Sequence, residues 1–267
     1  MTRVYALLAK ELADLRANPG LFFPAVLTGL LSLSLPFFVA IIVPQLTGER
    51  LADSSDFATA MQMYRSDPVT TVLSAEGAVQ AWVFRQFLVL LVFAPIAGAM
   101  SVAAYTVIGE KQARTLEPLL ATPISTAELL FAKVLGALIP ALLLSLGSFA
   151  LYLLGVMVLA EPGVFRVLLT TRPLSIVLVL GPMASLAALQ LAVCVSSRVN
   201  DARSAQQIGA LIILPISGLL VAQLMGRVEL TGAGIAMAAI ALLTVNLVLM
   251  RIGVAIFDRE SILTRWK

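Results

Sequence analysis

The sequence contains no histidine and only one cysteine among its 267 residues. Histidine is the commonest metal ligand and the usual general base near neutral pH, so its absence removes the ordinary centre of both chemistries. A single cysteine, Cys194, excludes an intramolecular disulfide and any CxxC redox or zinc site. Because Cys194 lies within an apolar run, we interpret it as a small buried side chain rather than a functional thiol.

Charge is also scarce. Charged residues form 12% of the chain and hydrophobic residues 60%, whereas soluble domains contain about 25% charged and roughly 45–50% apolar residues. A soluble core of this length could not bury so much apolar surface, so the composition predicts an integral membrane protein. The sequence GxxxxGK(S/T) is missing too, and with it the phosphate-binding loop of many ATPases.

Six apolar segments are long enough to cross a bilayer, whose hydrocarbon core requires about 20 residues of helix. The predicted fold class is therefore an all-α membrane protein with six transmembrane helices. We expect the spans near residues 21–46, 82–108, 127–159, 174–197, 207–225 and 232–257. The other expected parts are an external loop at residues 47–81, a cytoplasmic loop at residues 109–126 and a cytoplasmic tail at residues 258–267.

Residues 1–20 precede the first span and have the pattern of an amphipathic helix that ends at Asn18-Pro19-Gly20. The charged residues, including Glu11, lie mostly off the apolar stripe. This pattern predicts a helix lying in the cytoplasmic membrane interface. The alternative is a helix packed on the protein's own loops. The apolar stripe consists of Val4, Leu7, Leu8, Leu12 and Leu15.

The distribution of basic residues predicts the orientation. With both termini in the cytoplasm, twelve of the 18 Lys and Arg residues lie on the cytoplasmic side and six on the outer side. The positive-inside rule therefore predicts a multi-pass protein of the cytoplasmic (inner or cell) membrane with both termini inside. Lys133 and Arg251 fall near the cytoplasmic ends of spans, where we expect their long side chains to extend to the interface.

Residues 109–129, GEKQARTLEPLLATPISTAEL, form a compact polar segment between the second and third apolar runs. Thr115 can cap a short helix, and Glu117 in its first turn interacts favourably with the helix dipole. Pro123 ends this helix, because proline cannot continue a helical hydrogen-bond ladder. The sequence therefore predicts a short helix that joins two long ones.

The predicted short helix carries one apolar face, formed by Leu116, Leu119 and Leu120 at helical spacing. A helix of this length is marginal by itself and requires packing on another surface. That surface is either the protein's own helix ends or a groove on a cytoplasmic partner. The residues alone leave both alternatives open.

The same segment resembles the cytoplasmic loop of ABC type-2 transporter permeases, whose pattern includes T-L-E-x-L-L-x-x-P-(I/V)-S. Arg114 stands where that family often has glycine. The rest of the chain is compatible with this family, from the N-terminal helix and six spans to the C-terminal FDRESILTRWK. The matching residues are Glu110, Thr115, Leu116, Glu117, Leu119, Leu120, Pro123 and Ser125.

The resemblance implies the permease subunit of an ATP-driven exporter, with no enzymatic site of its own. A separate nucleotide-binding subunit would bind ATP and Mg, so no cofactor is expected in this chain. The other expected partners are a second permease copy or a paralogue, forming a dimer, and the lipid membrane, but no nucleic acid. The loop would form the coupling helix that contacts the ATPase through Glu110, Arg114, Thr115, Leu116, Glu117, Leu119, Leu120 and Pro123.

Among the polar side chains inside the expected spans, four are candidates for function: Ser145, Ser148, Gln190 and Asn246. Intramembrane polar residues can line a translocation path for the substrate. They can also hydrogen-bond neighbouring helices and hold them together. Both interpretations are open for each of the four residues.

Two other classes of function compete with a transporter subunit. A stand-alone carrier or channel would need similar spans but no ATPase, although these spans do not divide into halves with matching loops, as inverted repeats would. An integral membrane enzyme is poorly supported, because histidine and clustered intramembrane carboxylates are missing. The sequence does not identify the cargo, and lipid-like, peptide, drug-like, polysaccharide and ion cargoes are all compatible with it.

Overall fold

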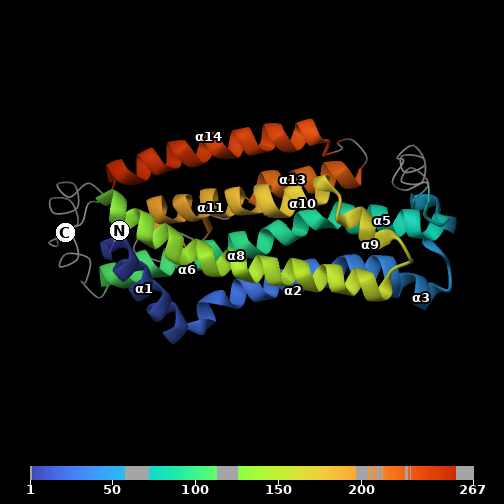
Figure 1. The fold of residues 1–267 in the computed structure, drawn as a ribbon, viewed down its shortest axis with the longest axis horizontal. Helices are drawn as coiled ribbons and strands as arrows, with labels where there is room; N and C mark the ends of the chain where they lie inside the picture. Colours follow the sequence, from blue (N-terminus) through green and yellow to red (C-terminus); the bar gives the residue numbers. More distant parts are fainter. Residues whose placement is uncertain are drawn as a thin grey trace.

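The computed structural model describes residues 2–57, 72–112, 126–196, 204, 207–208, 211, 213–225, 228 and 230–256. These residues form a bundle of long helices that run along a common axis (Figure 1). The described part of the chain contains no β-strand. The predicted all-α membrane fold is confirmed.

Five helical stretches are long and apolar enough to cross a membrane. The first comprises η1 (Pro19–Phe22), α2 (Phe23–Phe37), η2 (Phe38–Ile42) and α3 (Val43–Thr47). The second comprises α5 (Ala75–Phe87), η5 (Leu88–Val92) and α6 (Phe93–Gln112). The third is α8 (Thr126–Leu159). The fourth comprises α10 (Thr171–Ser175), η6 (Ile176–Leu180) and α11 (Gly181–Ser196), and the fifth is α14 (Gly232–Ile256).

The shorter elements complete the order of the chain. A sixth apolar helix, α13 (Ile213–Leu224), precedes α14, so that the five long stretches and α13 follow the order of the six apolar segments of the sequence. Helix α1 (Thr2–Ala17) comes first, and α9 (Val164–Leu168) lies between α8 and α10. The turns η3 (Leu51–Asp53) and η4 (Ser55–Phe57) follow α3.

The two ends of the bundle hold different elements. Helix α1 lies at one end, where α6 ends and α8 begins; this end is named the α1 end (Figure 1). The last turns of α14 reach the same end, because Gly253 lies close to Leu130 near the start of α8. Helices α3 and α9 lie at the opposite end, named the α9 end (Figure 1).

The second and fourth helical stretches form the centre of the bundle. In the most apolar part of each, 72% and 67% of the residues are buried, whereas the values for the first, third and fifth stretches are 22%, 28% and 11%. The outer faces of α2, α8 and α14 therefore present apolar side chains to the surroundings. Such faces suit lipid hydrocarbon, in which helices satisfy their own backbone hydrogen bonds.

Buried apolar side chains form two clusters along the bundle. One cluster joins α1, α6, α11 and the first half of α8, and the other joins η3, α5, α9 and the second half of α8. The central helices pass from one cluster to the other at η5 and η6, which lie side by side. In these turns, Val89, Val92, Ile176 and Leu180 belong to the first cluster, and Leu88, Leu91 and Val177 to the second.

The turn η5 departs from α-helical hydrogen bonding. A 3-10 helix pairs residues three apart instead of four. In this way the backbone N–H of Phe93 donates to the carbonyl oxygen of Leu90. A carbonyl oxygen has two lone pairs and can accept a further donor. Two neighbouring helices supply hydroxyl donors there. Ser32 Oγ of α2 donates to the carbonyl oxygen of Leu90 at 2.8 Å, and Tyr152 Oη of α8 donates to that of Phe84 at 2.6 Å. The irregular turn is thus part of the packed structure.

Candidate functional site

Most of the predicted coupling residues lie outside the described residues. These are Arg114, Thr115, Leu116, Glu117, Leu119, Leu120 and Pro123. The backbone of Glu110 lies in the last turn of α6, which ends at Gln112. Helix α8 begins at Thr126 with Glu128 in its first turn, where a carboxylate favours the helix dipole. Residues 113–125 therefore connect two helix ends that both lie at the α1 end of the bundle.

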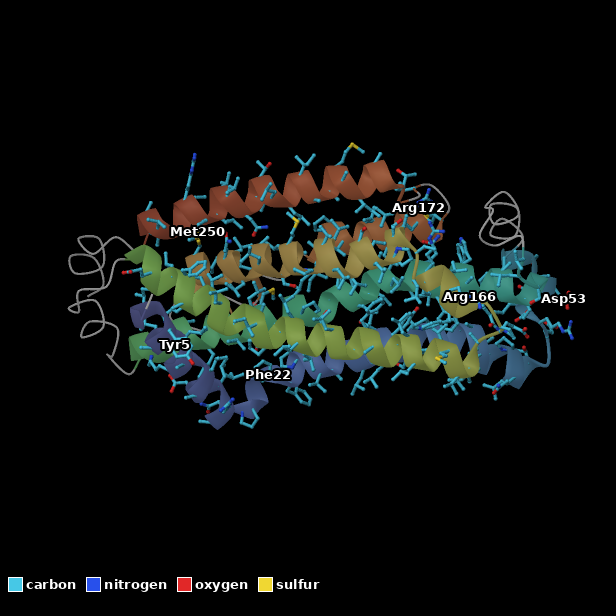
Figure 2. All side chains as sticks on the ribbon, in the orientation of Figure 1. Tyr5, Phe22, Asp53, Arg166, Arg172 and Met250 are labelled. Atoms are coloured by element: carbon cyan, nitrogen blue, oxygen red, sulfur yellow. The ribbon has the colours of Figure 1, made fainter. Side chains whose placement is uncertain are left out.

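Helix α1 packs against α8 at this end. Leu7 and Leu15 are buried, whereas Tyr5 on the other side of α1 is 75% exposed. Two residues of the apolar stripe, Leu7 and Leu15, are thus covered by the protein's own helices, and Leu8 and Leu12 are partly covered. Figure 2 shows Tyr5 and Phe22 at the α1 end, far from Asp53 and Arg166 at the α9 end.

Glu11 lies on the buried face of α1 and forms an ion pair with Lys133 of α8. The Lys133 Nζ and Glu11 Oε1 atoms are 3.1 Å apart, and the two side chains are only 1% and 4% exposed. Two expectations from the sequence are therefore wrong: Glu11 is not on the polar face, and the Lys133 side chain does not extend to an interface. Glu11 Oε1 also lies 3.8 Å from Lys10 Nζ on its own helix, so two ammonium groups stand close to this carboxylate.

Gly136 permits the close approach of α1 and α8. A Cβ atom at Gly136 would lie 2.8 Å from the Cβ atom of Glu11. Because Glu11 Cβ is attached directly to the backbone, relief of such a contact requires a shift of α1 itself. The glycine follows Lys133 by about one turn of α8, so the ion pair and the close backbone contact lie at the same place in the interface. This contact between α1 and α8 at Glu11, Lys133 and Gly136 is named the joint.

The surroundings of this ion pair differ from those of a second pair on α1. Lys10 Nζ lies 3.6 Å from Asp14 Oδ2 one turn along the helix, with the side chains 43% and 57% exposed. Exposed pairs of this kind contribute about 0–1 kcal/mol to stability. Removal of one partner from a buried pair costs about 3–5 kcal/mol, because the other charge is left without compensation. The Glu11–Lys133 pair is therefore the stronger constraint on α1.

The structure does not bring the four predicted intramembrane polar residues together. Ser145 and Ser148 are buried on α8, and Ser148 Oγ donates to the carbonyl oxygen of Leu144 at 3.0 Å. Ser148 faces α2, since a Cβ atom at Gly29 would lie 3.4 Å from its hydroxyl. Ser148 therefore occupies a helix interface that Gln190 and Asn246 do not share.

Gln190 and Asn246 both lie between α11 and α14. Asn246 Nδ2 donates to the carbonyl oxygen of Met183 on α11 at 3.0 Å and to that of Leu242 on its own helix at 2.8 Å. The amide nitrogen thus joins two helices. Within the described part of the chain, Asn246 Oδ1 and Gln190 Oε1 are buried and accept no hydrogen bond. Asn246 therefore holds two helices together, and both amides leave an acceptor open.

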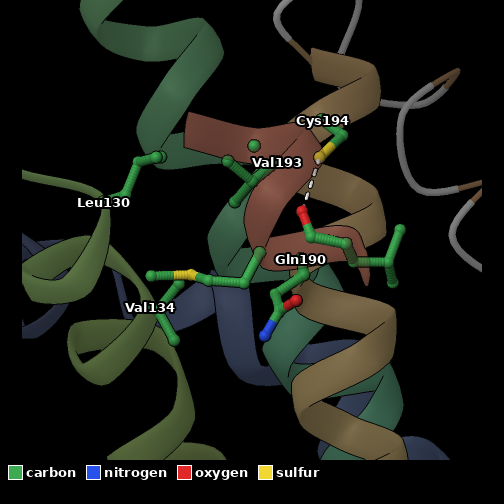
Figure 3. Close-up of a pocket in the computed structure, with 8 residues that line it drawn as sticks. Leu130, Val134, Gln190, Val193 and Cys194 are labelled. Atoms are coloured by element: carbon green, nitrogen blue, oxygen red, sulfur yellow. Dashed lines mark hydrogen bonds between the residues drawn. The ribbon is translucent and has the colours of Figure 1, made fainter. Parts of the chain in front are cut away.

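A small pocket adjoins Gln190 (Figure 3). Its volume is about 10 Å³, near the lower limit for one water molecule. Cys194 lies on its wall, and the Sγ atom contacts the carbonyl oxygen of Leu249 at 3.9 Å. The cysteine is buried, as expected from the apolar run around it. The remaining lining residues are Leu130, Val134, Val193, Leu249, Met250 and Gly253.

Residues 42–252 match a family described as ABC-2 family transporter protein. The chain belongs to this family. The match includes four of the five long helical stretches almost entirely, α13, and both helix ends that flank residues 113–125. No curated protein matches the chain. The resemblance found in the loop sequence is thus confirmed over most of the chain, and the protein is a multi-pass membrane permease of an ABC-type transporter.

The α9 end of this ABC-2 chain contains contacts that the sequence did not indicate. The carboxylate of Glu76 accepts hydrogen bonds from the backbone N–H groups of Leu51 and Ala52, at 3.4 and 3.1 Å. Gln80 Oε1 accepts one from the backbone N–H of Glu161 at 2.9 Å. Helix α5 therefore holds the connection that follows α3 and the connection between α8 and α9. Among the described residues, no group of three or more His, Cys, Asp or Glu side chains could hold a metal ion.

Proposed function

We propose that this chain is the transmembrane subunit of an ATP-driven ABC exporter in the cytoplasmic membrane. The family match over residues 42–252 carries the proposal. Membership of the family implies an ABC-type ATPase as a partner in general. In this proposal the ATPase is a separate subunit that binds ATP and Mg. The chain itself is not an enzyme, which agrees with its lack of a GxxxxGK(S/T) sequence.

The ATPase contacts the chain through the segment between α6 and α8. The proposal assigns the contact to the apolar face of Leu116, Leu119 and Leu120, and assigns charge matching to Glu110, Arg114 and Glu117. Thr115 and Pro123 delimit the short helix that carries them. Support comes from the sequence pattern of the segment and from the position of both flanking helix ends at the α1 end of the bundle.

The α1 end faces the cytoplasm in this proposal. The larger share of basic residues on that side, twelve of 18, supports this orientation. It places the segment that precedes Thr126 on the side where ATP is available. The α9 end, with Asp53, Arg166 and Arg172 (Figure 2), then faces outward.

Two copies of the chain, or this chain and a paralogue, enclose the translocation path. Ser145, Ser148, Gln190 and Asn246 are the candidates for polar groups along it. Gln190 and Asn246 each retain a buried carbonyl oxygen that can accept a hydrogen bond from cargo. The Ser148 hydroxyl already donates within α8, which favours a structural role for this residue.

Purification of the tagged chain from its native membrane tests the proposal. An ATP-hydrolysing subunit should accompany the chain, and the native mass should correspond to two permease and two ATPase chains. An active complex with a single permease chain would contradict the assembly. A chain that is active in reconstituted vesicles without any ATPase would instead be a stand-alone carrier or channel. Stimulation of ATP hydrolysis by added compounds would then identify the cargo class.

A further inference from the structure

The buried ion pair between Glu11 and Lys133 joins two parts of the chain that are 122 residues apart. Both charged side chains are removed from water, which disfavours burial unless the geometry is good. An apolar pair of similar volume would often serve stability equally well. A buried charge must lie next to its partner, so a charged pair permits only one alignment of the two helices, whereas apolar side chains tolerate several. Fixing how two helices are aligned is the best attested use of buried polar groups.

The position of the pair relates it to the proposed ATPase contact. Lys133 lies seven residues after Thr126, at which α8 begins, and thus about two turns from the segment at 113–125. Glu11 lies in the second half of α1. The pair therefore fastens α1 to the end of α8 that leads directly into this segment.

We propose that Glu11 and Lys133 are positioning residues that make α1 and the first turns of α8 move as one body during transport. This inference rests on the proposed function for its role in transport, but the mechanical joint itself concerns this chain alone. Gly136 contributes by bringing the two backbones close enough for the short ion pair. When the start of α8 is displaced, α1 then moves with it.

The first experiment measures the joint without reference to transport. Spin labels are attached at Ala13→Cys on α1 and Phe131→Cys on α8, two exposed positions, in a Cys194→Ala background in lipid nanodiscs. The distance distribution should be narrow. Glu11→Gln or Lys133→Gln should broaden it, and the exchanged pair Glu11→Lys with Lys133→Glu should narrow it again. Asp14→Asn, which removes the exposed pair on α1, is the matched control and should leave it unchanged.

The second experiment measures the consequence for function. ATP hydrolysis is followed in nanodiscs that contain the chain with its co-purified ATPase. The single variants should lower the maximal rate by about fivefold, with the same KM for ATP and the same amount of bound ATPase. The exchanged pair should recover the rate. A residue that served only stability would change the amount of complex and not the rate per complex.

The outcomes separate the two ideas. Narrow distances and normal rates in both single variants would overturn the positioning role, and broadened distances with normal rates would overturn its role in transport. If the single variants do not insert, Glu11→Leu with Lys133→Leu removes both charges at once; broadened distances in this variant support the joint, and wild-type distances overturn it. If no ATPase accompanies even the wild-type chain, the proposed function fails, while the distance measurement still decides the joint.

Discussion

The hydroxyl of Tyr152 donates a hydrogen bond of 2.6 Å to the carbonyl oxygen of Phe84, at the turn where α5 gives way to η5. The Tyr152 ring also stands edge-on to the rings of Phe37 and Phe84, with centroid distances of 5.6 and 5.9 Å. One fully buried side chain thus joins three helices by packing and by a polar contact.

Tyr152→Phe should destabilise the protein while preserving the ring contacts. The change leaves a buried carbonyl oxygen without its hydroxyl donor, which costs about 1–3 kcal/mol. Thermal unfolding in detergent should show a lower midpoint for this variant. Tyr5→Phe is the matched control, because Tyr5 is 75% exposed and its loss of a hydroxyl should have no measurable effect. Equal unfolding midpoints for the two variants would show that the hydrogen bond from Tyr152 to Phe84 does not contribute to stability.

Substitution by alanine should have different effects on stability at two glycines of α8. At Gly155 a Cβ atom would lie 2.6 Å from Phe37 Cζ, and that ring is held between Phe84 and Tyr152. At Gly147 no atom lies within 4 Å. Gly155→Ala should therefore lower stability by about 1–3 kcal/mol. Gly147→Ala should be neutral or raise it by up to about 1 kcal/mol, since alanine is the better helix former. A similar loss at both sites would contradict the packing around Phe37.

Asn246→Leu should loosen α14 from α11. The change removes the hydrogen bond from Nδ2 to Met183 on the neighbouring helix. Interhelical bonds in membranes contribute about 0.6 kcal/mol on average, so a similar loss is expected in the free energy of unfolding in SDS. Thr244→Val is the control, because the Thr244 hydroxyl is bonded only within α14, to Ile240, and is exposed. Unchanged stability together with impaired cargo-stimulated ATPase would instead place Asn246 on the translocation path.

Leu119→Ala and Leu120→Ala should weaken binding of the ATPase or uncouple ATP hydrolysis from transport. Truncation of an interface anchor in a desolvated pocket costs about 2 kcal/mol or more. Glu117→Lys should act similarly, partly through the loss of a helix-dipole interaction of about 0.3–1 kcal/mol. Membrane levels should stay normal, and Asp56→Lys at the other end should leave coupling intact. Wild-type binding and transport by all three loop variants would mean that the segment packs only on its own chain.

Cysteine labelling in intact cells should establish the orientation. In a Cys194→Ala background, a cysteine at Asp56 should react with an impermeant reagent from outside, and cysteines at Arg203 and Arg265 only after the membrane is opened. The reason is the excess of basic residues on the cytoplasmic side. Labelling of Asp56 only from inside would invert the topology and move the proposed ATPase contact to the wrong side.

The main elements of the fold could be predicted because apolar runs of sufficient length have few alternatives to membrane helices. The sequence also indicated the amphipathic α1 and the break after it. The start of α5 at Ala75 was harder to anticipate. Glu76 and Gln80 make this part of the sequence look like a loop, but both side chains bond to backbone groups of adjacent connections.

The joint at the α1 end could not be predicted from local pattern. Glu11 looked like a polar-face residue because its partner Lys133 is distant in sequence, and only the packing of α1 on α8 brings the two charges together. Lys133 alone looked like a residue near a membrane interface. The turns η5 and η6 were equally hidden, since the sequences LVLLV and IVLVL read as ordinary apolar helix. Their shape depends on contacts with other helices.

The position of these two turns has a mechanical consequence. Helices bend most readily where their hydrogen-bond ladder is irregular, and η5 is a 3-10 helix while η6 is a π-helix. The two are neighbours and lie where one cluster of buried side chains ends and the next begins. Helix α8, by contrast, continues as one α-helix through both clusters. The two central helices can therefore change direction at η5 and η6, while α8 keeps the two clusters aligned along the bundle.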